Sequence, residues 1–266
     1  MTFARQSVAR PIRFEGLGLH TGTPVVMTIH PSEDGIRFRI RGETVIAAPE
    51  NVTDTTRSTR LGSIGTVEHL MSAFAGLEIT DAEVELTAPE VPGMDGSSGP
   101  FIDALSDAGI VTFGESAVPS LYRRVFIKEG ETEIAVAKGS GHWRYAFDTG
   151  SRWPGVQVYE SRSVQTDYRD AVCRARTFAF AEEIPMIIQM GLGKGLDETS
   201  ALILGIEGYK NDPRFDDEPA RHKMLDIIGD LYLAGIPIRH LNVSADRSGH
   251  TANVKAAAML KQSIEP

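Results

Sequence analysis

The feature that most restricts the possible folds of this chain is an order of elements that occurs twice. Each half has a helical stretch with a histidine in its first turns, a glycine that ends it, an alternating strand, a Ser-Gly loop and a further helix. Ser98-Gly99-Pro100 in the first half corresponds to Ser248-Gly249-His250 in the second. Two copies of one unit bury their apolar faces best by packing face to face. We therefore expect an α+β fold of two related two-layer α/β sandwich domains, formed by internal duplication.

The break between the copies is expected between about Gly114 and Ser120. This gives an N-terminal α+β domain of residues 1–116 and a C-terminal α+β domain of residues 117–266, with an insert around residues 180–215. A chain of 266 residues, 41% of them hydrophobic, is long enough to bury two cores of ordinary size.

The overall charge excludes several classes of partner. With 27 Lys and Arg against 36 Asp and Glu, the net charge of −9 argues against nucleic-acid binding and against an anionic membrane surface. The one cysteine, Cys173, cannot form an internal disulfide or a cysteine-based zinc site. Since the chain has no secretory pattern and no apolar run of membrane-spanning length, we expect a cytoplasmic protein without stable membrane insertion. We also expect a monomer.

The helix expected over residues 216–235 carries an unusual density of ionisable side chains. Acidic residues and a proline mark its start, and a glycine marks its end. His222 and Asp226 are four residues apart and therefore lie on the same helical face. That spacing suits two ligands of one metal ion, or a plain hydrogen bond at the surface. Lys223 and Asp230 form a second ionisable row beside the first.

A second helix is expected over residues 67–75, with Thr66 as its cap. It carries Glu68 and His69, which are adjacent and therefore about 100° apart around the helix axis. One of them can bind a metal ion while the other stands beside it.

These two helices would form a catalytic metal site if they met at the interface of the halves. Two imidazoles and one carboxylate, from His69, His222 and Asp226, leave a tetrahedral zinc ion with one open position, as catalytic zinc sites require. Glu68 would then be placed to take a proton from water, and His250, on a glycine-containing loop, could give a proton to a leaving group.

Lys223 could steady an oxyanion or a phosphate at such a site. The same ligand types would also suit a non-haem iron oxygenase. Glu68 and His250 favour metal-assisted hydrolysis of an amide or ester instead. If the two helices stay apart, Glu68, His69 and His222 are ordinary caps and surface residues.

Several short motifs, in order from about residue 5 to residue 260, resemble the UDP-3-O-acyl-N-acetylglucosamine deacetylase family. Members of this family are zinc enzymes of the first committed step of lipid A synthesis. Gly18-Leu19-His20-Thr21-Gly22 is similar to its N-terminal signature. The other motifs are Thr66-Val67-Glu68-His69-Leu70, Met94-Asp95-Gly96-Ser97, Ala175-Arg176-Thr177-Phe178, Arg221-His222-Lys223-Met224-Leu225-Asp226 and Ser248-Gly249-His250.

The resemblance implies a zinc-dependent hydrolase that releases acetate and a free amine from the acetamide of a UDP-3-O-acyl-N-acetylglucosamine. In this family's pattern His69, His222 and Asp226 match the zinc ligands. Glu68 matches the general base and His250 the general acid. The family's fold, two α+β domains with the site between them, agrees with the repeated order of elements.

Further positions take roles from the resemblance. Thr177 matches the hydroxyl that contacts the oxyanion, and Lys223 and Asp230 match polar residues of the site, with Asp230 orienting His250. Contacts with the sugar-nucleotide substrate are expected from Phe178 near the sugar, Arg247 at the diphosphate, His20 and Leu192.

The chain departs from the family pattern where the substrate would be recognised. The loop between Arg60 and Thr66 is short, and the turn at residues 193–200 has an unusual sequence that includes Asp197 and Glu198. This turn belongs to the insert that forms the acyl-chain passage in the family. Two alternatives therefore stay open: a deacetylase of another N-acetylated sugar or acetamide without a long acyl chain, and a sugar-nucleotide-binding paralogue without turnover.

Overall fold

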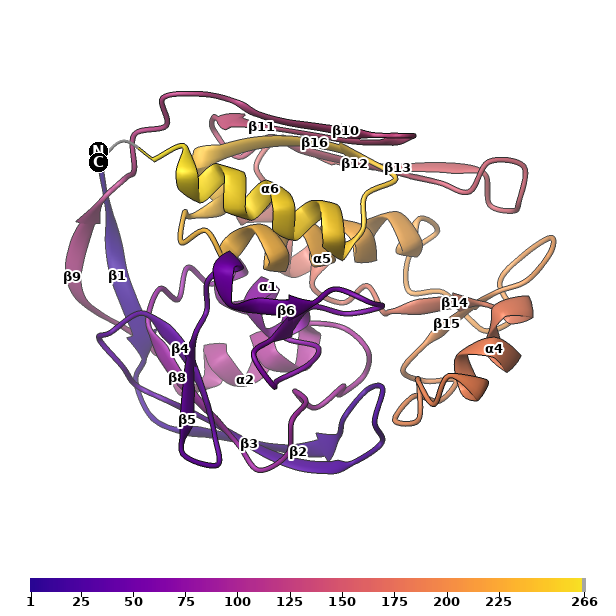
Figure 1. The fold of residues 1–266 in the computed structure, drawn as a ribbon, viewed down its shortest axis with the longest axis horizontal. Helices are drawn as coiled ribbons and strands as arrows, with labels where there is room; N and C mark the ends of the chain where they lie inside the picture. The colour runs from indigo at the N-terminus through magenta and orange to yellow at the C-terminus, as the bar shows by residue number, and fades with distance from the viewer. Residues whose placement is uncertain (265–266) are drawn as a thin grey trace.

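The computed structural model describes residues 1–264. In this part of the chain two five-stranded sheets enclose two layers of helices, which gives a sheet–helix–helix–sheet arrangement (Figure 1). The apolar side chains of both sheets and of the helices between them form the buried core.

The N-terminal sheet has the strand order β2-β3-β8-β4-β5. Its strands are β2 (Ile12–Leu17), β3 (Pro24–His30), β4 (Ile36–Ile40), β5 (Glu43–Ile46) and β8 (Ala82–Leu86). Two helices, α1 (Glu68–Gly76) and α2 (Gly99–Ala108), belong to this half.

The C-terminal sheet has the order β10-β11-β16-β12-β13. Its strands are β10 (Val125–Glu129), β11 (Thr132–Lys138), β12 (Trp143–Asp148), β13 (Val156–Ser161) and β16 (Leu241–Asp246). Two helices, α5 (Glu218–Tyr232) and α6 (His250–Gln262), pack against this sheet.

The two sheets have the same topology. In each, the third and fourth strands in spatial order are parallel, β8 with β4 and β16 with β12, while the other neighbours are antiparallel. The predicted fold of two related α+β units is therefore confirmed. Strands β1 (Thr2–Val8) and β9 (Ile110–Ala117) form a separate antiparallel pair before the second unit begins. The boundary between residues 116 and 117 stays a prediction.

The strands follow from the alternation of apolar and charged residues. In β4, Ile36, Phe38 and Ile40 are buried, whereas Arg37 and Arg39 lie on the opposite face and pair with acidic residues of β8. Because successive side chains of a strand point to opposite faces, this pattern gives one apolar face for the helices and one charged face for solvent.

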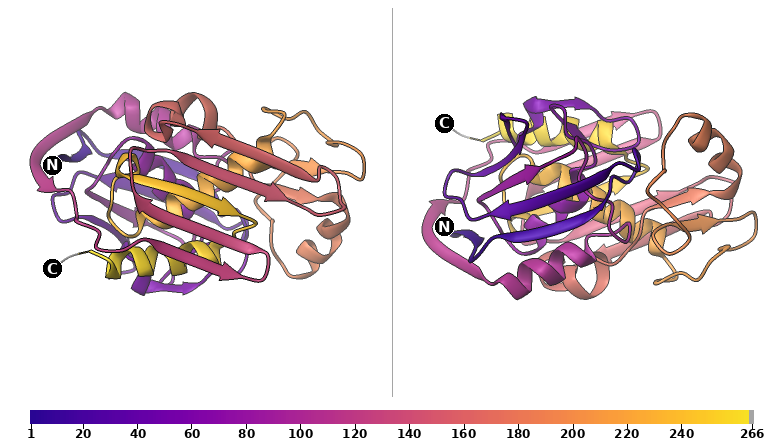
Figure 2. Two further views of the ribbon diagram at one scale, coloured as in Figure 1. Left: turned by 90° about the horizontal axis from the view of Figure 1, so that it is seen from above. Right: turned by 90° about the horizontal axis from the view of Figure 1, so that it is seen from below.

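Each half carries additional chain at the same place, between its fourth sheet strand in chain order and the helix that follows, which means between β5 and α1 in the N-terminal half and between β13 and α5 in the C-terminal half. In the N-terminal half this segment contains the short strands β6 (Val52–Asp54) and β7 (Arg60–Leu61). In the C-terminal half it begins with the short helix α3 (Val164–Asp167). It continues with β14 (Phe178–Phe180), α4 (Ile184–Gln189) and β15 (Leu202–Leu204), which project from one end of the molecule (Figure 2).

Helices α1 and α5 pack against each other between the two sheets (Figure 1). Gly229 of α5 allows their close approach, because a Cβ at this position would lie 2.0 Å from the backbone oxygen of Glu68. The first turn of α1 therefore lies directly beside α5. Within residues 1–264, no helix is both long enough and apolar enough to cross a membrane.

The start of α1 differs from the expected cap. Thr66 has a φ of 58° and its hydroxyl donates to the Glu90 carboxylate at 2.8 Å, while the cap position is Val67. Glu90 also accepts from the backbone N–H groups of His20 and Thr21. The prediction of a Thr66 cap was wrong because this buried carboxylate binds the hydroxyl instead.

Candidate active site

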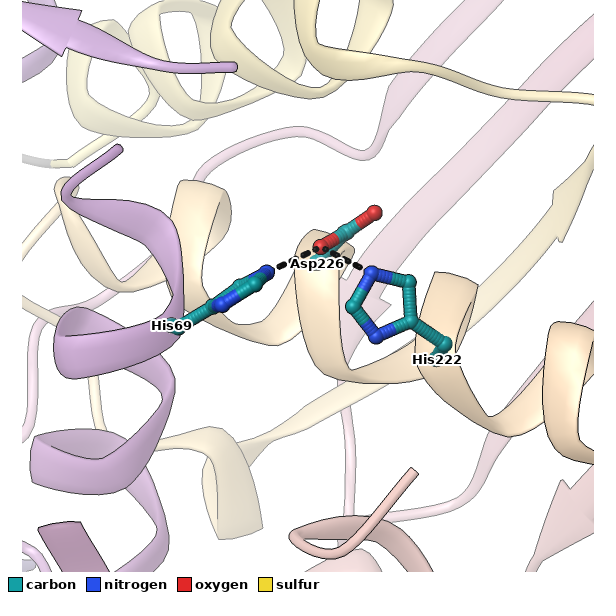
Figure 3. Close-up of side chains that lie close together, drawn as sticks. All are labelled: His69, His222 and Asp226. Carbon is teal, nitrogen blue, oxygen red and sulfur yellow. Dashed lines mark ion pairs between the residues drawn. The ribbon is translucent and has the colours of Figure 1, made fainter. Parts of the chain in front are cut away.

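Three side chains from α1 and α5 form a compact buried cluster at the interface of the halves. His69 comes from the first turn of α1, and His222 and Asp226 lie one turn apart on α5 (Figure 3). Both histidines direct Nε2 toward Oδ1 of Asp226, at 3.6 Å from His69 and 3.5 Å from His222. One ligand atom from each residue lies within 4.8 Å of the other two.

The chemistry of these donors fits a metal ion. Oδ1 of Asp226 is buried and has no hydrogen-bond partner among residues 1–264. Nδ1 of His222 donates to the backbone oxygen of Ala175 at 3.1 Å, which leaves Nε2 free as a ligand. An orphaned buried carboxylate oxygen beside two imidazole nitrogens is costly in a protein unless a cation binds there.

The charges of the cluster suit this binding. Burial lowers the pKa of His222 to about 3, so its imidazole is neutral. Burial works against the Asp226 carboxylate, but the Lys223 ammonium and the surrounding imidazoles outweigh it and hold the pKa of Asp226 well below its usual range. The ammonium of Lys223 donates at 2.8 Å to Oδ2 of Asp226, whereas His69 and His222 approach Oδ1.

Glu68 and His250 lie next to this cluster and close to each other. Nε2 of His250 is 4.0 Å from Oε1 of Glu68 and 4.0 Å from Oδ2 of Asp226. Burial raises the pKa of Glu68. Burial would lower the pKa of His250, but the Asp230 carboxylate outweighs it and raises this pKa to about 9.

Asp230 lies beneath His250 and is fully buried. Its Oδ2 accepts from Nδ1 of His250 at 3.0 Å and from the side-chain amide of Asn253 at 3.0 Å. Its Oδ1 accepts from the hydroxyl of Thr59 at 2.5 Å. Because Nδ1 of the imidazole is held in this way, Nε2 points back toward Glu68.

Sequence reasoning missed Thr59. Its segment has no motif, and two of its partners, Asp230 and His250, are 171 and 191 residues away in the chain.

Thr177 and Phe178 reach the site from the start of β14. Backbone hydrogen bonds hold Thr177 in place, since its N–H donates to Gly96 and its carbonyl accepts from Leu202. The Phe178 ring lies 5.9 Å from the His222 ring, centroid to centroid, and 5.6 Å from the Lys223 ammonium.

One cavity of about 880 Å³ connects the cluster with the insert. Most of the predicted site residues line it: His20, Glu68, His69, Thr177, Phe178, Leu192, His222, Lys223, Asp226 and His250. The insert lines it with the apolar side chains of Ile184, Ile187, Ile188, Leu192, Leu196 and Ile203, and also with the polar side chains of Glu183, Asp197, Glu198, Lys210 and Asn211.

Arg247 lies outside the residues that line this cavity. Its guanidinium pairs with Asp148 at 2.7 Å and with Glu131, beside a smaller hollow on the outer surface of the C-terminal sheet. Its expected contact with a diphosphate stays a prediction.

Comparison with known proteins identifies the family of this chain. The family model for UDP-3-O-acyl N-acetylglycosamine deacetylase matches residues 5–262. A protein named UDP-3-O-acyl-N-acetylglucosamine deacetylase from Teredinibacter turnerae is 38% identical, over 94% of this chain and 87% of its own. A protein of the same name from Cellvibrio japonicus is 36% identical, and the match covers 96% of this chain and 89% of its own. One from Geobacter sp. is 34% identical, with 96% of this chain and 88% of its own covered. The chain therefore belongs to the UDP-3-O-acyl N-acetylglycosamine deacetylase family.

Proposed function

We propose that this protein is a zinc-dependent deacetylase of lipid A biosynthesis. Its substrate would be a UDP-3-O-acyl-N-acetylglucosamine, whose acetamide it hydrolyses to acetate and a free amine. The observation that carries this proposal is the buried His69, His222 and Asp226 cluster with Glu68 beside it, in a cavity that the insert lines in part with apolar side chains.

His69, His222 and Asp226 would hold the zinc ion. When bound, zinc would supply Lewis-acid activation of the water and of the acetamide carbonyl. The protein contributes a dry, preorganised site, since all three side chains are buried.

The other residues handle protons and charge. Glu68 accepts a proton from the water that adds to the carbonyl carbon, and its buried carboxylate has no need to move. Thr177 and Lys223 lie along the cavity wall, where a hydroxyl and an ammonium stabilise the developing oxyanion. When the C–N bond breaks, Nε2 of His250 donates a proton to the departing nitrogen. Asp230 keeps that imidazole in the orientation and the tautomer needed for this transfer.

An acylated substrate is favoured by the apolar side chains with which the insert lines the cavity. Asp197, one of the two acidic residues of the turn that departs from the family pattern, is occupied by that turn: Oδ1 accepts from the backbone N–H groups of Thr199 and Ser200 at 2.8 and 3.0 Å. This carboxylate therefore shapes the turn, and the side chains of Ile184, Ile187 and their apolar neighbours offer the surface for the acyl chain. A cytoplasmic location and a monomeric state remain predictions.

Metal analysis combined with a turnover assay tests this function. The zinc-loaded chain should release acetate from UDP-3-O-acyl-N-acetylglucosamine and not from UDP-N-acetylglucosamine. Equal or better turnover of the non-acylated sugar nucleotide would favour a deacetylase of another acetamide. Bound zinc without any turnover would mean a binding paralogue.

A further inference from the structure

Thr59 contacts Glu68, the proposed proton acceptor, and also Asp230, the partner of the proposed proton donor His250. Its backbone N–H donates to Oε2 of Glu68 at 2.9 Å, and its hydroxyl donates to Oδ1 of Asp230 at 2.5 Å. The same hydroxyl oxygen lies 3.3 Å from Nδ1 of His250. One residue thus contacts the carboxylate beside the metal ligands, and also the acid–imidazole pair across from it.

These contacts are buried, which makes them decisive for geometry. Thr59 and Asp230 are 0% exposed and Glu68 is 2% exposed. A buried carboxylate that loses a donor must find another or carry the desolvation cost, and hydrogen bonds to charged groups are the stronger class. The orientations of both carboxylates therefore depend on where Thr59 is held.

The position of Thr59 in the chain explains how it bridges the halves. It lies between β6 and β7, in the additional segment of the N-terminal half. Glu68 belongs to the same half, whereas Asp230 and His250 belong to α5 and α6 of the other. The corresponding segment of the C-terminal half supplies Thr177, so both additional segments contribute a threonine hydroxyl to the site.

We propose that Thr59 is a positioning residue that fixes the Glu68 carboxylate relative to the His250 imidazole. Their 4.0 Å separation places the proton acceptor and the proton donor at one reacting amide. This inference rests on the proposed function, because it assigns to both side chains a part in one hydrolysis.

The first experiment compares Thr59→Val with Thr59→Ser in the full, zinc-loaded chain. Valine keeps the shape and the backbone N–H but removes the hydroxyl donor to Asp230. We expect kcat to fall by about 10–100-fold, as for other residues that orient a metal-site group. KM should stay within about twofold, because the substrate contacts are intact. Thr59→Ser, which restores the hydroxyl, should recover most of kcat, with equal zinc content in all three proteins.

A double-mutant cycle with Asp230→Asn shows whether Thr59 acts through that carboxylate. If it does, the double variant should have a kcat close to that of Asp230→Asn alone. Two effects that multiply would mean independent structural damage and would overturn the proposal.

Tyr168→Phe is a matched control for the loss of a buried hydroxyl. The Tyr168 hydroxyl donates to Ser72 of α1 at 2.8 Å and also joins the two halves, but it contacts neither Glu68 nor His250. We expect a comparable loss of stability and a kcat within about twofold of the parent. A loss of kcat as large as that of Thr59→Val would mean that any weakened contact between the halves has this effect.

An NMR measurement that does not depend on catalytic activity tests the positioning role of Thr59 separately from the proposed function. The proton on Nδ1 of His250 should give a downfield NMR resonance, assigned by its absence in His250→Gln. Thr59→Val should shift it, and Tyr168→Phe should leave it in place. A parent chain that releases no acetate refutes the proposed function, whereas an unshifted resonance in Thr59→Val refutes the positioning role.

Discussion

In the N-terminal half, α1 brings Glu68 and His69 to the site from adjacent positions in its first turn. In the C-terminal half, α5 distributes His222, Asp226 and Asp230 along one face over two turns. Adjacent helical positions diverge by about 100°, so one side chain of α1 faces the other ligands while its neighbour stands beside them. Residues four apart share a direction and can act as a stack. Two copies of one fold thus supply complementary parts of a site that neither half contains alone.

The additional segments of the two halves also contribute different parts of the site. The short N-terminal segment holds Thr59 against Glu68 and Asp230, and so orients groups that are already in the site. The longer C-terminal segment builds the apolar wall of the cavity with α4 and its neighbours. In the proposed function, the same insertion point would therefore serve geometry in one half and substrate recognition in the other.

The most direct test of this comparison between the halves is whether each half contributes a metal ligand. His69→Ala and His222→Ala should each lose the bound zinc and nearly all acetate release, because two remaining donors do not hold a catalytic zinc ion. Elemental analysis after dialysis measures the metal. Full zinc content in His69→Ala would remove the N-terminal half from the metal site.

The next test asks whether the two adjacent residues of α1 have separate tasks. Glu68→Gln should retain zinc, because Glu68 is not a ligand, and should lower kcat by about 10²–10⁴-fold, the usual contribution of a general base. Steady-state kinetics and metal analysis on the same sample measure both. An unchanged kcat would contradict the assignment of Glu68 as the base.

The pH dependence of kcat should show how Asp230 of α5 changes the pKa of His250. In the proposed function, His250 acts as an acid while protonated, so activity should be present below its pKa and should be lost as the pH rises through it. Burial lowers this pKa, and the Asp230 carboxylate outweighs burial and raises it to about 9. Asp230→Asn removes that carboxylate charge, so the alkaline limb of the profile should move to lower pH. An unmoved limb would show that another group controls it.

The role of the C-terminal insert in binding the acyl chain can be tested by comparing a residue that lines the cavity with an exposed neighbour. Ile187 lines the cavity, whereas Met186 beside it is 47% exposed. Ile187→Lys should raise KM for the acylated substrate by about tenfold, because burying an ammonium beside an acyl chain costs at least the ~1.4 kcal/mol that this corresponds to. Met186→Lys is the matched control and should leave KM unchanged. Equal effects of the two variants would argue against an acyl chain at this wall.

The smallest expected effect concerns the contact between α1 and α5. Gly229→Ala places a methyl group where the Glu68 carbonyl lies, and should lower the free energy of unfolding by about 1–3 kcal/mol through overpacking. A Cβ at Gly208 would meet no atom within 4 Å. Gly208→Ala should therefore change this free energy by less than about 0.5 kcal/mol. Urea denaturation measures both variants, and equal stabilities would mean that the helices tolerate a wider separation.

Much of the fold was predictable because its signals are local. The alternation in β4 and the spacing of His222 and Asp226 each depend on a few neighbouring residues. The repeated order of elements predicted two related units, and the matching strand orders confirm it. Thr66 shows the limit of such signals, since a residue typical of helix caps instead binds Glu90, 24 residues later.

The sequence by itself determined which elements form, their order in the two halves, and which ionisable residues each helix presents. Only the tertiary structure decided that α1 and α5 meet at Gly229, that Thr59 joins Glu68 to Asp230, and that Arg247 turns to acidic partners outside the cavity. The physical reason is separation along the chain: Arg247 and Asp148, for example, are 99 residues apart. Such pairs form only when packing of the two cores brings them within hydrogen-bond distance, and a sequence pattern of a few residues carries no record of that distance.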